Sequence, residues 1–241
     1  MTLLTLERVR KSYWRGRHEV VVLDGVSCEL DAGDFAAVFG QRASGKTTLL
    51  RIAAGIESPD AGAVRFGGRD VATRRPPSRV AGLDPRIGWM RRSGPLIASM
   101  EMLDYVALPL FGTLRHREAH RVATRVLNDV GAKDLAHATW GALSDAERTL
   151  VMLAQATVRR PLLLLADDPT VSLGLEERES ILRLLRKVAE AGGMAVLMTV
   201  PEVPDMLGAH QVMSLSGGEL IRTTPRPRAQ VIELRRRSES R

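Results

Sequence analysis

The sequence predicts an α/β protein with an antiparallel β part at its N-terminal end and a helical lobe inserted into the core. Three observations lead to this fold class. The first forty residues alternate short β-branched runs with turns, and the middle third carries helical spacing without strong strand signals. The last third alternates buried apolar runs with a helix, which is typical of a parallel sheet covered by helices.

The N-terminal part, from Leu3 to Phe39, is predicted to form antiparallel strands. Two β-branched runs, Val20–Leu23 and Val26–Leu30, are separated by the turn-forming pair Asp24-Gly25. A second turn is expected at Ala32-Gly33-Asp34.

A strand, a glycine-bounded loop and a helix are predicted next. Phe35–Phe39 is an apolar strand that leads directly into the loop, and Thr48–Ala54 has the helical pattern. A short β segment near Ala63–Phe66 precedes a loop rich in proline, arginine and glycine from Arg69 to Pro85.

The middle third, roughly Ser99 to Arg159, is predicted to be helical, and we place the helical subdomain at about residues 93–159. After it, Leu162–Ala166 is a wholly apolar run, typical of a parallel strand buried on both faces. A helix from Glu176 to Ala191 and a second buried strand from Met194 to Thr199 follow.

Composition excludes several classes of protein. Hydrophobic residues make up 44% and charged residues 26% of the chain, which is ordinary globular usage. The longest apolar run is far shorter than the roughly 20 residues of a transmembrane helix, and the N-terminus lacks the features of a secretory signal. The only cysteine, Cys28, lies in an alternating strand pattern, so we expect a small core residue in a reducing cytoplasm.

The chain is basic, with a formal charge of +7, and its base is almost entirely arginine. A compositional bias towards arginine explains this charge, and attraction to a polyanion, either nucleic acid or an anionic membrane face, is the alternative. Aromatic residues make up only 4% of the chain, too few for a stacking surface, so no specific nucleic-acid partner is expected. We predict one domain over residues 1–225 and a basic, flexible tail over 226–241.

One segment carries the pattern Gly-x-x-x-x-Gly-Lys-Thr with a strand before it and a helix after it. In such a loop the backbone amides surround the phosphates of a nucleotide, the lysine reaches the β and γ oxygens, and the threonine hydroxyl binds Mg²⁺. The pattern therefore predicts ATP and Mg²⁺ as ligands. The residues predicted to hold the nucleotide phosphates are Gly40, Gln41, Arg42, Ala43, Ser44, Gly45, Lys46, Thr47 and Thr48.

Two acids, Asp167 and Asp168, directly follow the buried run Leu162–Ala166. An acid at the end of a buried strand suits the shell of a magnesium ion beside the phosphate loop. We therefore predict Thr47 and Asp167 as metal ligands; two acids that merely cap a strand exit are the alternative.

Together these residues resemble the ATP-binding-cassette (ABC) ATPases, and among them the subunits of lipoprotein-release and macrolide-type exporters, over about residues 2 to 224. The resemblance implies a P-loop NTPase (RecA-like) core with an N-terminal antiparallel β subdomain and an inserted α-helical subdomain. It also implies that Tyr13 stacks on adenine. The other matching segments are 20–26, 49–55, 59–64, 106–110, 143–144 and 166–170.

Several positions depart from the family pattern. By the resemblance, Arg92 replaces the glutamine that senses magnesium and the attacking water, and Val200 replaces a histidine that touches the γ-phosphate. Asp168 is one methylene shorter than the catalytic glutamate. These three are the predicted, altered catalytic positions, although a guanidinium at Arg91 or Arg92 could instead stabilise transition-state charge as an arginine finger does.

The signature segment is altered as well. The family reads Leu-Ser-Gly-Gly-Gln where this chain reads Leu143-Ser144-Asp145-Ala146-Glu147. Ser144 remains available to the ATP of a partner subunit, but Asp145 places a carboxylate near it. Two like charges about 4 Å apart repel by roughly 4 kcal/mol at an effective dielectric constant of 20. Gly174 replaces an aspartate that helps to join the two subunits.

A second signature-like stretch, Leu215–Glu219, comes after the last core strand, and we predict a β-turn there. The resemblance implies a second nucleotide-binding subunit, identical or different, and a transmembrane permease subunit that docks near Pro95–Leu110. It places the chain in the cytoplasm, on the inner face of the membrane. We expect an exporter ATPase with slow turnover; a non-hydrolysing, nucleotide-dependent regulatory subunit is the alternative.

Overall fold

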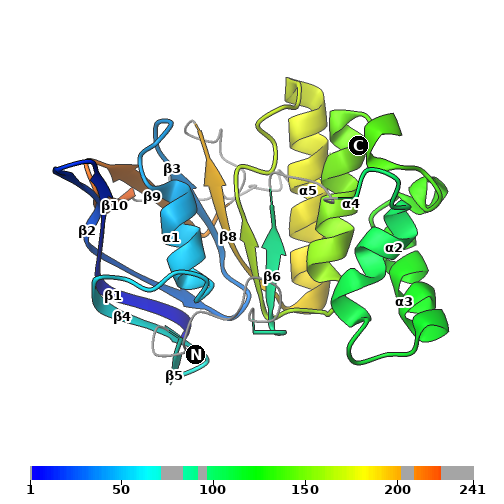
Figure 1. Cartoon of the computed structure of the whole chain (residues 1–241), viewed down its shortest axis with the longest axis horizontal. Coiled ribbons are helices and arrows are strands. Elements are labelled where there is room, and N and C mark those ends of the chain that lie inside the picture. Colours follow the sequence, from blue (N-terminus) through cyan, green and yellow to red (C-terminus); the bar gives the residue numbers. More distant parts are fainter. Residues whose placement is uncertain (1, 72–83, 92–96, 202–208, 224–241) are drawn as a thin grey trace, which may run out of the picture.

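The strands lie towards one end of the longest axis of the molecule, and most of the helices lie towards the other end (Figure 1). The computed structural model describes residues 2–71, 84–91, 97–201 and 209–223. The strands are β1 (Thr2–Arg15), β2 (His18–Asp31), β3 (Phe35–Phe39), β4 (Ala61–Phe66), β5 (Arg69–Asp70), β6 (Ile87–Met90), β7 (Leu163–Ala166), β8 (Ala195–Val200), β9 (Gln211–Ser216) and β10 (Glu219–Thr223). The helices are α1 (Lys46–Ala53), α2 (Met102–Ala107), α3 (His116–Asp129), α4 (Asp145–Thr157) and α5 (Leu175–Gly192), with short 3-10 turns η1 (Leu108–Leu110), η2 (Lys133–Leu135) and η3 (Trp140–Ala142).

The N-terminal strands form an antiparallel sheet, as predicted, and their order is β2-β1-β4-β5. The predicted turn at Asp24-Gly25 is wrong, because β2 continues through it. Val9 pairs with Val26 and Lys11 with Leu23, so two residues of β2 lie opposite the single residue Arg10. This is a β-bulge, and Gly25 accommodates it with a φ of 70°. The short strand β5 also lies within the segment predicted as a loop.

The second sheet has six strands in the order β10-β9-β3-β8-β7-β6. All neighbours are parallel except β10, which pairs antiparallel with β9. The predicted buried strands are confirmed, although β7 begins at Leu163 rather than at Leu162, which is 44% exposed. Helix α1 begins at Lys46, two residues before the predicted Thr48, so its first turn is part of the glycine-bounded loop motif.

The six-stranded sheet separates two hydrophobic cores. Successive side chains of a strand point to opposite faces of the sheet. Leu163 and Leu165 of β7 therefore join the first core, which contains α1 and the N-terminal sheet. Leu164 and Ala166 face the second core, which contains α4 and α5. The continuous apolar run of β7 is thus explained by burial on both faces.

The helical lobe packs at the far end of the second core (Figure 1). Ala119, Ala123 and Leu127 of α3 are fully buried and spaced four residues apart, which places them on one stripe of the helix. Tyr105 of α2 meets Trp140 edge to face, with ring centroids 6.1 Å apart. The helical pattern predicted for this third of the chain is confirmed.

Two smaller predictions are also confirmed. The β-turn predicted within Leu215–Glu219 joins β9 to β10, and Gly217 and Gly218 have φ values of 59° and 85°, as a tight turn of this kind requires. Its predicted place after the last core strand is wrong, because Leu215 and Ser216 end β9, which pairs in parallel with β3. Cys28 is buried in the first core, and burial raises the pKa of its thiol to about 12.

Gly88 of β6 is required by the contact of this strand with α4. A Cβ atom at this position would lie 2.3 Å from the Ala156 carbonyl oxygen and 2.9 Å from Pro161 Cγ. We expect Gly88→Ala to lower the free energy of unfolding by about 1–3 kcal/mol, because backbone must shift to relieve the overlap. Urea denaturation measures this, and Gly112→Ala is the matched control because a Cβ atom there would meet no described residue within 4 Å beyond its chain neighbours. Equal stability of the two variants would contradict the prediction.

Candidate functional site

The loop between β3 and α1 is shaped by its two glycines. Gly45 has a φ of 101°, and a Cβ atom there would lie 2.8 Å from Val22 Cγ1 and 2.9 Å from the Val22 carbonyl oxygen. At Gly40 a Cβ atom would lie 2.4 Å from the Leu215 carbonyl oxygen. The loop therefore passes between β2 and β9 at distances that exclude any side chain at these two positions.

Two polar side-chain groups of the loop are buried, the Ser44 hydroxyl and the Lys46 ammonium. Ser44 Oγ is buried and has no hydrogen-bond partner among the described residues. The Lys46 side chain is also buried, and its Nζ donates to the carbonyl oxygens of Gly40 at 2.7 Å and Gln41 at 3.1 Å. A buried ammonium and an unpartnered hydroxyl inside a glycine cradle fit an anionic group such as a phosphate.

Thr47 and Asp167 lie side by side although they are far apart in the sequence. Thr47 Oγ1 donates to both carboxylate oxygens of Asp167, at 3.1 and 2.9 Å. Asp167 Oδ1 also accepts a hydrogen bond from Thr199 Oγ1 at 3.1 Å. A buried carboxylate with a neighbouring hydroxyl is a donor set that suits a hard divalent cation such as Mg²⁺.

Asp168 is buried next to this pair at the end of β7. Its backbone N–H donates to Thr199 Oγ1 at 3.0 Å, and its φ is 45°. Asp tolerates the left-handed region better than most residues, because its short side chain can hydrogen-bond locally. Thr199 thus orients both acids, and sequence reasoning missed it; a single hydroxyl at the end of the apolar strand β8 was the available signal.

Tyr13 lies at the rim of the same region and is held by its hydroxyl. This group donates to Glu57 Oε1 at 2.6 Å and lies 3.3 Å from Thr48 Oγ1. Burial and the hydrogen bond to Glu57 raise the pKa of Tyr13. Tyr13 as a whole is 36% exposed and lines the cavity described below, while Lys11 Nζ lies over its ring, 5.6 Å from the centroid. No pattern in the sequence indicated that Glu57 holds this ring.

The signature segment forms the first turn of α4. Ser144 is the N-cap: its Oγ accepts from the Glu147 backbone N–H at 3.3 Å, while Glu147 Oε2 accepts from the Ser144 backbone N–H at 2.8 Å. The Ser144 backbone N–H and the Ser144 hydroxyl both donate to Glu147 Oε2, and these two hydrogen bonds lower the pKa of Glu147. Asp145 accepts a hydrogen bond at 3.0 Å from Arg148, whose guanidinium lies over the Trp140 ring. The Asp145 carboxylate therefore has a cation beside it.

A cavity of about 930 Å³ brings many of the predicted residues together. It extends from the glycine loop to the first turn of α4, and Arg91, Arg148 and Pro201 also line it. The predicted site residues that line it are Tyr13, Arg42, Ala43, Ser44, Gly45, Lys46, Thr47, Thr48 and Asp168.

Other predicted residues do not line this cavity. Gly40 and Gln41 contribute carbonyl oxygens to Lys46, and Asp167 contributes its carboxylate to Thr47. Val200 is buried at the end of β8, and Ser144 caps α4. Arg92, the first two residues of the predicted docking segment (95–96) and the tail 226–241 lie outside the described residues.

Comparison with known proteins identifies the family to which this arrangement belongs. The family model described as "ABC transporter" matches residues 23–171, well over half of the chain. This chain belongs to the ABC transporter family. Within that family it is an ATP-binding cassette, which confirms the fold class predicted from the sequence.

Two curated relatives have sequences similar to this cassette. The lipoprotein-releasing system ATP-binding protein LolD of Anaplasma marginale is 33% identical over 91% of this chain and 98% of its own length. The macrolide export ATP-binding/permease protein MacB of Syntrophobacter fumaroxidans is 29% identical over 90% of this chain, but only 31% of its own length is matched. The cassette thus spans about a third of the MacB relative.

A solved structure resembles this cassette over almost its whole length. It is the dimeric post-hydrolysis state of the ATP-binding cassette MJ0796 with ADP and Pi, which covers 93% of this chain with a TM-score of 0.80 and 25% sequence identity. Within the described part of this cassette, no helix is long and apolar enough to cross a membrane.

Proposed function

We propose that this chain is the ATP-binding subunit of an ABC exporter, and that it binds Mg-ATP and hydrolyses it slowly. The proposal rests on the buried Lys46 side chain and the buried Ser44 hydroxyl, which lie inside a cradle formed by Gly40 and Gly45. In this proposal Lys46 exchanges its bonds to the Gly40 and Gln41 carbonyl oxygens for bonds to phosphate oxygens.

Each remaining part of the cavity has a role in this proposal. Tyr13, fixed by Glu57, stacks on the adenine, and Thr47 with Asp167 holds Mg²⁺. Mg²⁺, when bound, neutralises charge on the phosphate oxygens. Thr199 keeps the Asp167 carboxylate directed towards Thr47. The proposal also keeps the predicted domain boundaries: the nucleotide-binding domain over residues 1–225, its helical subdomain over about 93–159, and the basic tail over 226–241.

Slow turnover is proposed because the groups expected to act on the attacking water are altered. Asp168 has a shorter side chain than glutamate, and a displacement of about 1 Å at a reacting group can lower a rate on the order of a hundredfold. Val200 presents an isopropyl group, which neither donates a hydrogen bond nor holds a proton. Arg92 places a cation where the resemblance implies a neutral amide.

Closure of a dimer is also proposed to be weakened, but less than the sequence alone suggests. Asp145 would repel a triphosphate held by the partner subunit, yet Arg148 lies 3.0 Å from the Asp145 carboxylate. This pair is partly exposed, so its attraction is worth little by itself, about 0–1 kcal/mol. Its main effect is to reduce the negative charge presented at Ser144.

The proposed partners are a second nucleotide-binding subunit and a transmembrane permease. The similarity to a dimeric cassette and to an ATP-binding/permease protein supports both. The names of the LolD and MacB relatives support export rather than import. A subunit with these partners would lie on the cytoplasmic, inner face of the membrane.

The test is a Mg-ATP titration of the purified chain beside an assay of phosphate release, with and without its permease. We expect saturable binding that depends on Mg²⁺, and phosphate release well below that of a cassette with unaltered motifs. Binding with normal turnover would contradict the slow-turnover part. Absence of binding would contradict the whole proposal.

A second candidate function is a regulatory subunit that binds ATP without hydrolysing it. Val200 favours it, because an isopropyl group rather than an imidazole stands at the end of β8. Binding without any phosphate release in the complete complex would select this function over slow hydrolysis.

A further inference from the structure

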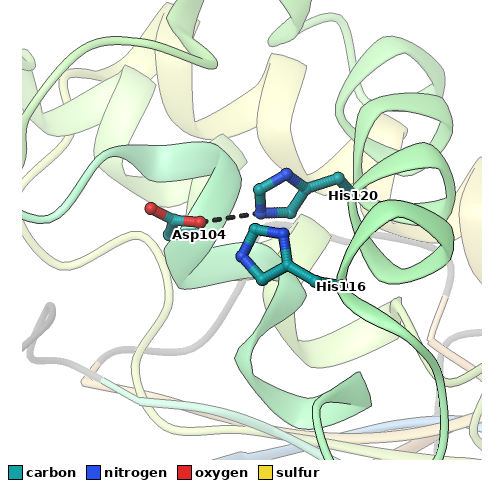
Figure 2. Close-up of side chains that lie close together, drawn as sticks. All are labelled: Asp104, His116 and His120. Atoms are coloured by element: carbon teal, nitrogen blue, oxygen red, sulfur yellow. Dashed lines mark hydrogen bonds and ion pairs between the residues drawn. The ribbon is translucent and has the colours of Figure 1, made fainter.

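A second group of chemically active side chains lies in the helical lobe. Figure 2 shows Asp104 of α2 and two histidines of α3, His116 and His120, with their polar ends directed towards one another. One ligand atom from each of the three lies within 4.8 Å of the other two. Among the described residues, this is the one group of at least three metal-ligating side chains with that proximity.

The spacing along the chain brings these side chains together. His116 and His120 are four residues apart on α3, so they share one face of the helix, and their ring centroids are 4.0 Å apart. Asp104 comes from the neighbouring helix, and its Oδ1 lies 2.7 Å from His120 Nε2. Residues of both helices belong to the second hydrophobic core, which fixes α2 against α3.

An aromatic side chain supports the two imidazoles. The Phe111 ring stacks on His116 with an interplanar angle of 7° and a centroid distance of 5.2 Å, and it lies 6.1 Å from His120. This contact restricts the rotation of the His116 ring and shields one side of the group from water. An apolar wall beside the ligands controls the access of water to a metal site and its local dielectric constant.

We propose that Asp104, His116 and His120 form a binding site for a divalent first-row transition metal ion, with Zn²⁺ as the best match. Two imidazole nitrogens and one carboxylate oxygen are a donor set typical of Zn²⁺, whereas Mg²⁺ and Ca²⁺ prefer oxygen ligands alone. Ligands of a tetrahedral zinc ion lie about 3.3 Å apart, given metal–ligand bonds of about 2.0–2.1 Å. The three ligand atoms lie within 4.8 Å of one another, and the 2.7 Å between His120 Nε2 and Asp104 Oδ1 would lengthen by about 0.6 Å around such an ion.

The site has room for a fourth ligand. His116 is exposed, whereas Asp104 and His120 are half-buried, so water can reach the fourth position of a tetrahedral ion from the His116 side. An ion held there would link α2 to α3. Because Asp104 lies in the segment proposed to dock the permease, occupancy would also stiffen that contact; this consequence, unlike the site itself, rests on the proposed function.

A simpler role for these residues is a salt bridge between His120 and Asp104. That role does not need His116, so the two explanations predict different effects of changing His116. The chain also supplies a matched control. His137 Nδ1 lies 2.9 Å from Glu101 Oε2, which repeats the histidine–carboxylate pair without a second histidine among the described residues.

The test is a Zn²⁺ titration of the tag-free, full-length chain against a chromophoric chelator, in a background of Mg²⁺ that occupies hard oxygen sites. We expect about one high-affinity ion per chain. His116→Ala, His120→Ala and Asp104→Asn should each weaken binding by at least about tenfold, while His137→Ala leaves it unchanged.

A second measurement guards against loss of folding in the variants. At free Zn²⁺ about a hundred times the dissociation constant, the Tm of the unaltered chain should rise by about 5 °C or more. The rise should disappear in His116→Ala. Without zinc its Tm should stay within about 4 °C of that of His137→Ala, because both side chains are exposed and each loses one contact, with the Phe111 ring and the Glu101 carboxylate respectively. Unchanged zinc affinity in His116→Ala, or equal weakening in His137→Ala, would overturn the proposal.

Discussion

Replacing Lys46 with alanine is expected to lower the affinity for Mg-ATP by at least about a hundredfold. Hydrogen bonds to charged groups contribute about 1.5–3 kcal/mol each, and about 1.4 kcal/mol corresponds to a tenfold change in affinity. Lys46 is a buried ammonium in the glycine cradle, so its removal takes away a buried positive charge that lines the cavity. A titration with a fluorescent ATP analogue measures the effect.

The variant must remain folded for this result to have meaning. Lys46→Ala removes two hydrogen bonds to carbonyl oxygens of its own loop, so circular dichroism and Tm should accompany the titration. Lys187→Ala on α5 is the matched control, because it removes an exposed lysine outside the cavity lining. An affinity that stays within about threefold of that of the unaltered chain would show that this loop does not bind the phosphates.

Replacing Asp168 with glutamate is expected to raise the rate of phosphate release by about tenfold to a hundredfold. The added methylene moves the carboxylate outward by about 1 Å, and a reacting group displaced by that distance can lose on the order of a hundredfold in rate. Asp168 lines the cavity and is buried, so its position is fixed by the Thr199 hydroxyl and the end of β7. The measurement is phosphate release at saturating Mg-ATP.

The gain has an opposing cost. Asp168 has a φ of 45°, a conformation in which glutamate is less favourable than aspartate, so part of the benefit is lost to backbone strain. Asp168→Asn should abolish release while leaving binding intact, and Asp134→Glu, in η2, tests the same chemical change far from the cavity lining. A rate that does not rise in Asp168→Glu would show that this side chain is not what limits turnover.

The sequence by itself predicted those parts of the protein whose structure depends on residues close together in the chain. The apolar runs that became β3, β7 and β8 have their pattern because both faces of a parallel strand are buried. The loop from Gly40 to Thr47 could be predicted because a phosphate cradle needs glycine at fixed positions next to a strand and a helix. Both are local patterns, and the family follows from their order along the chain.

The tertiary structure decided what depends on contacts between distant residues. Thr199 holds Asp167 and Asp168 from 32 and 31 residues away, and Glu57 holds Tyr13 across 44 residues. Asp24-Gly25 is a bulge rather than a turn because β1 continues beside it, and no local signal carries that information. Asp104 acquires two histidines only because α2 packs against α3. Side-chain partners of this kind are set by packing, which a one-dimensional pattern does not specify.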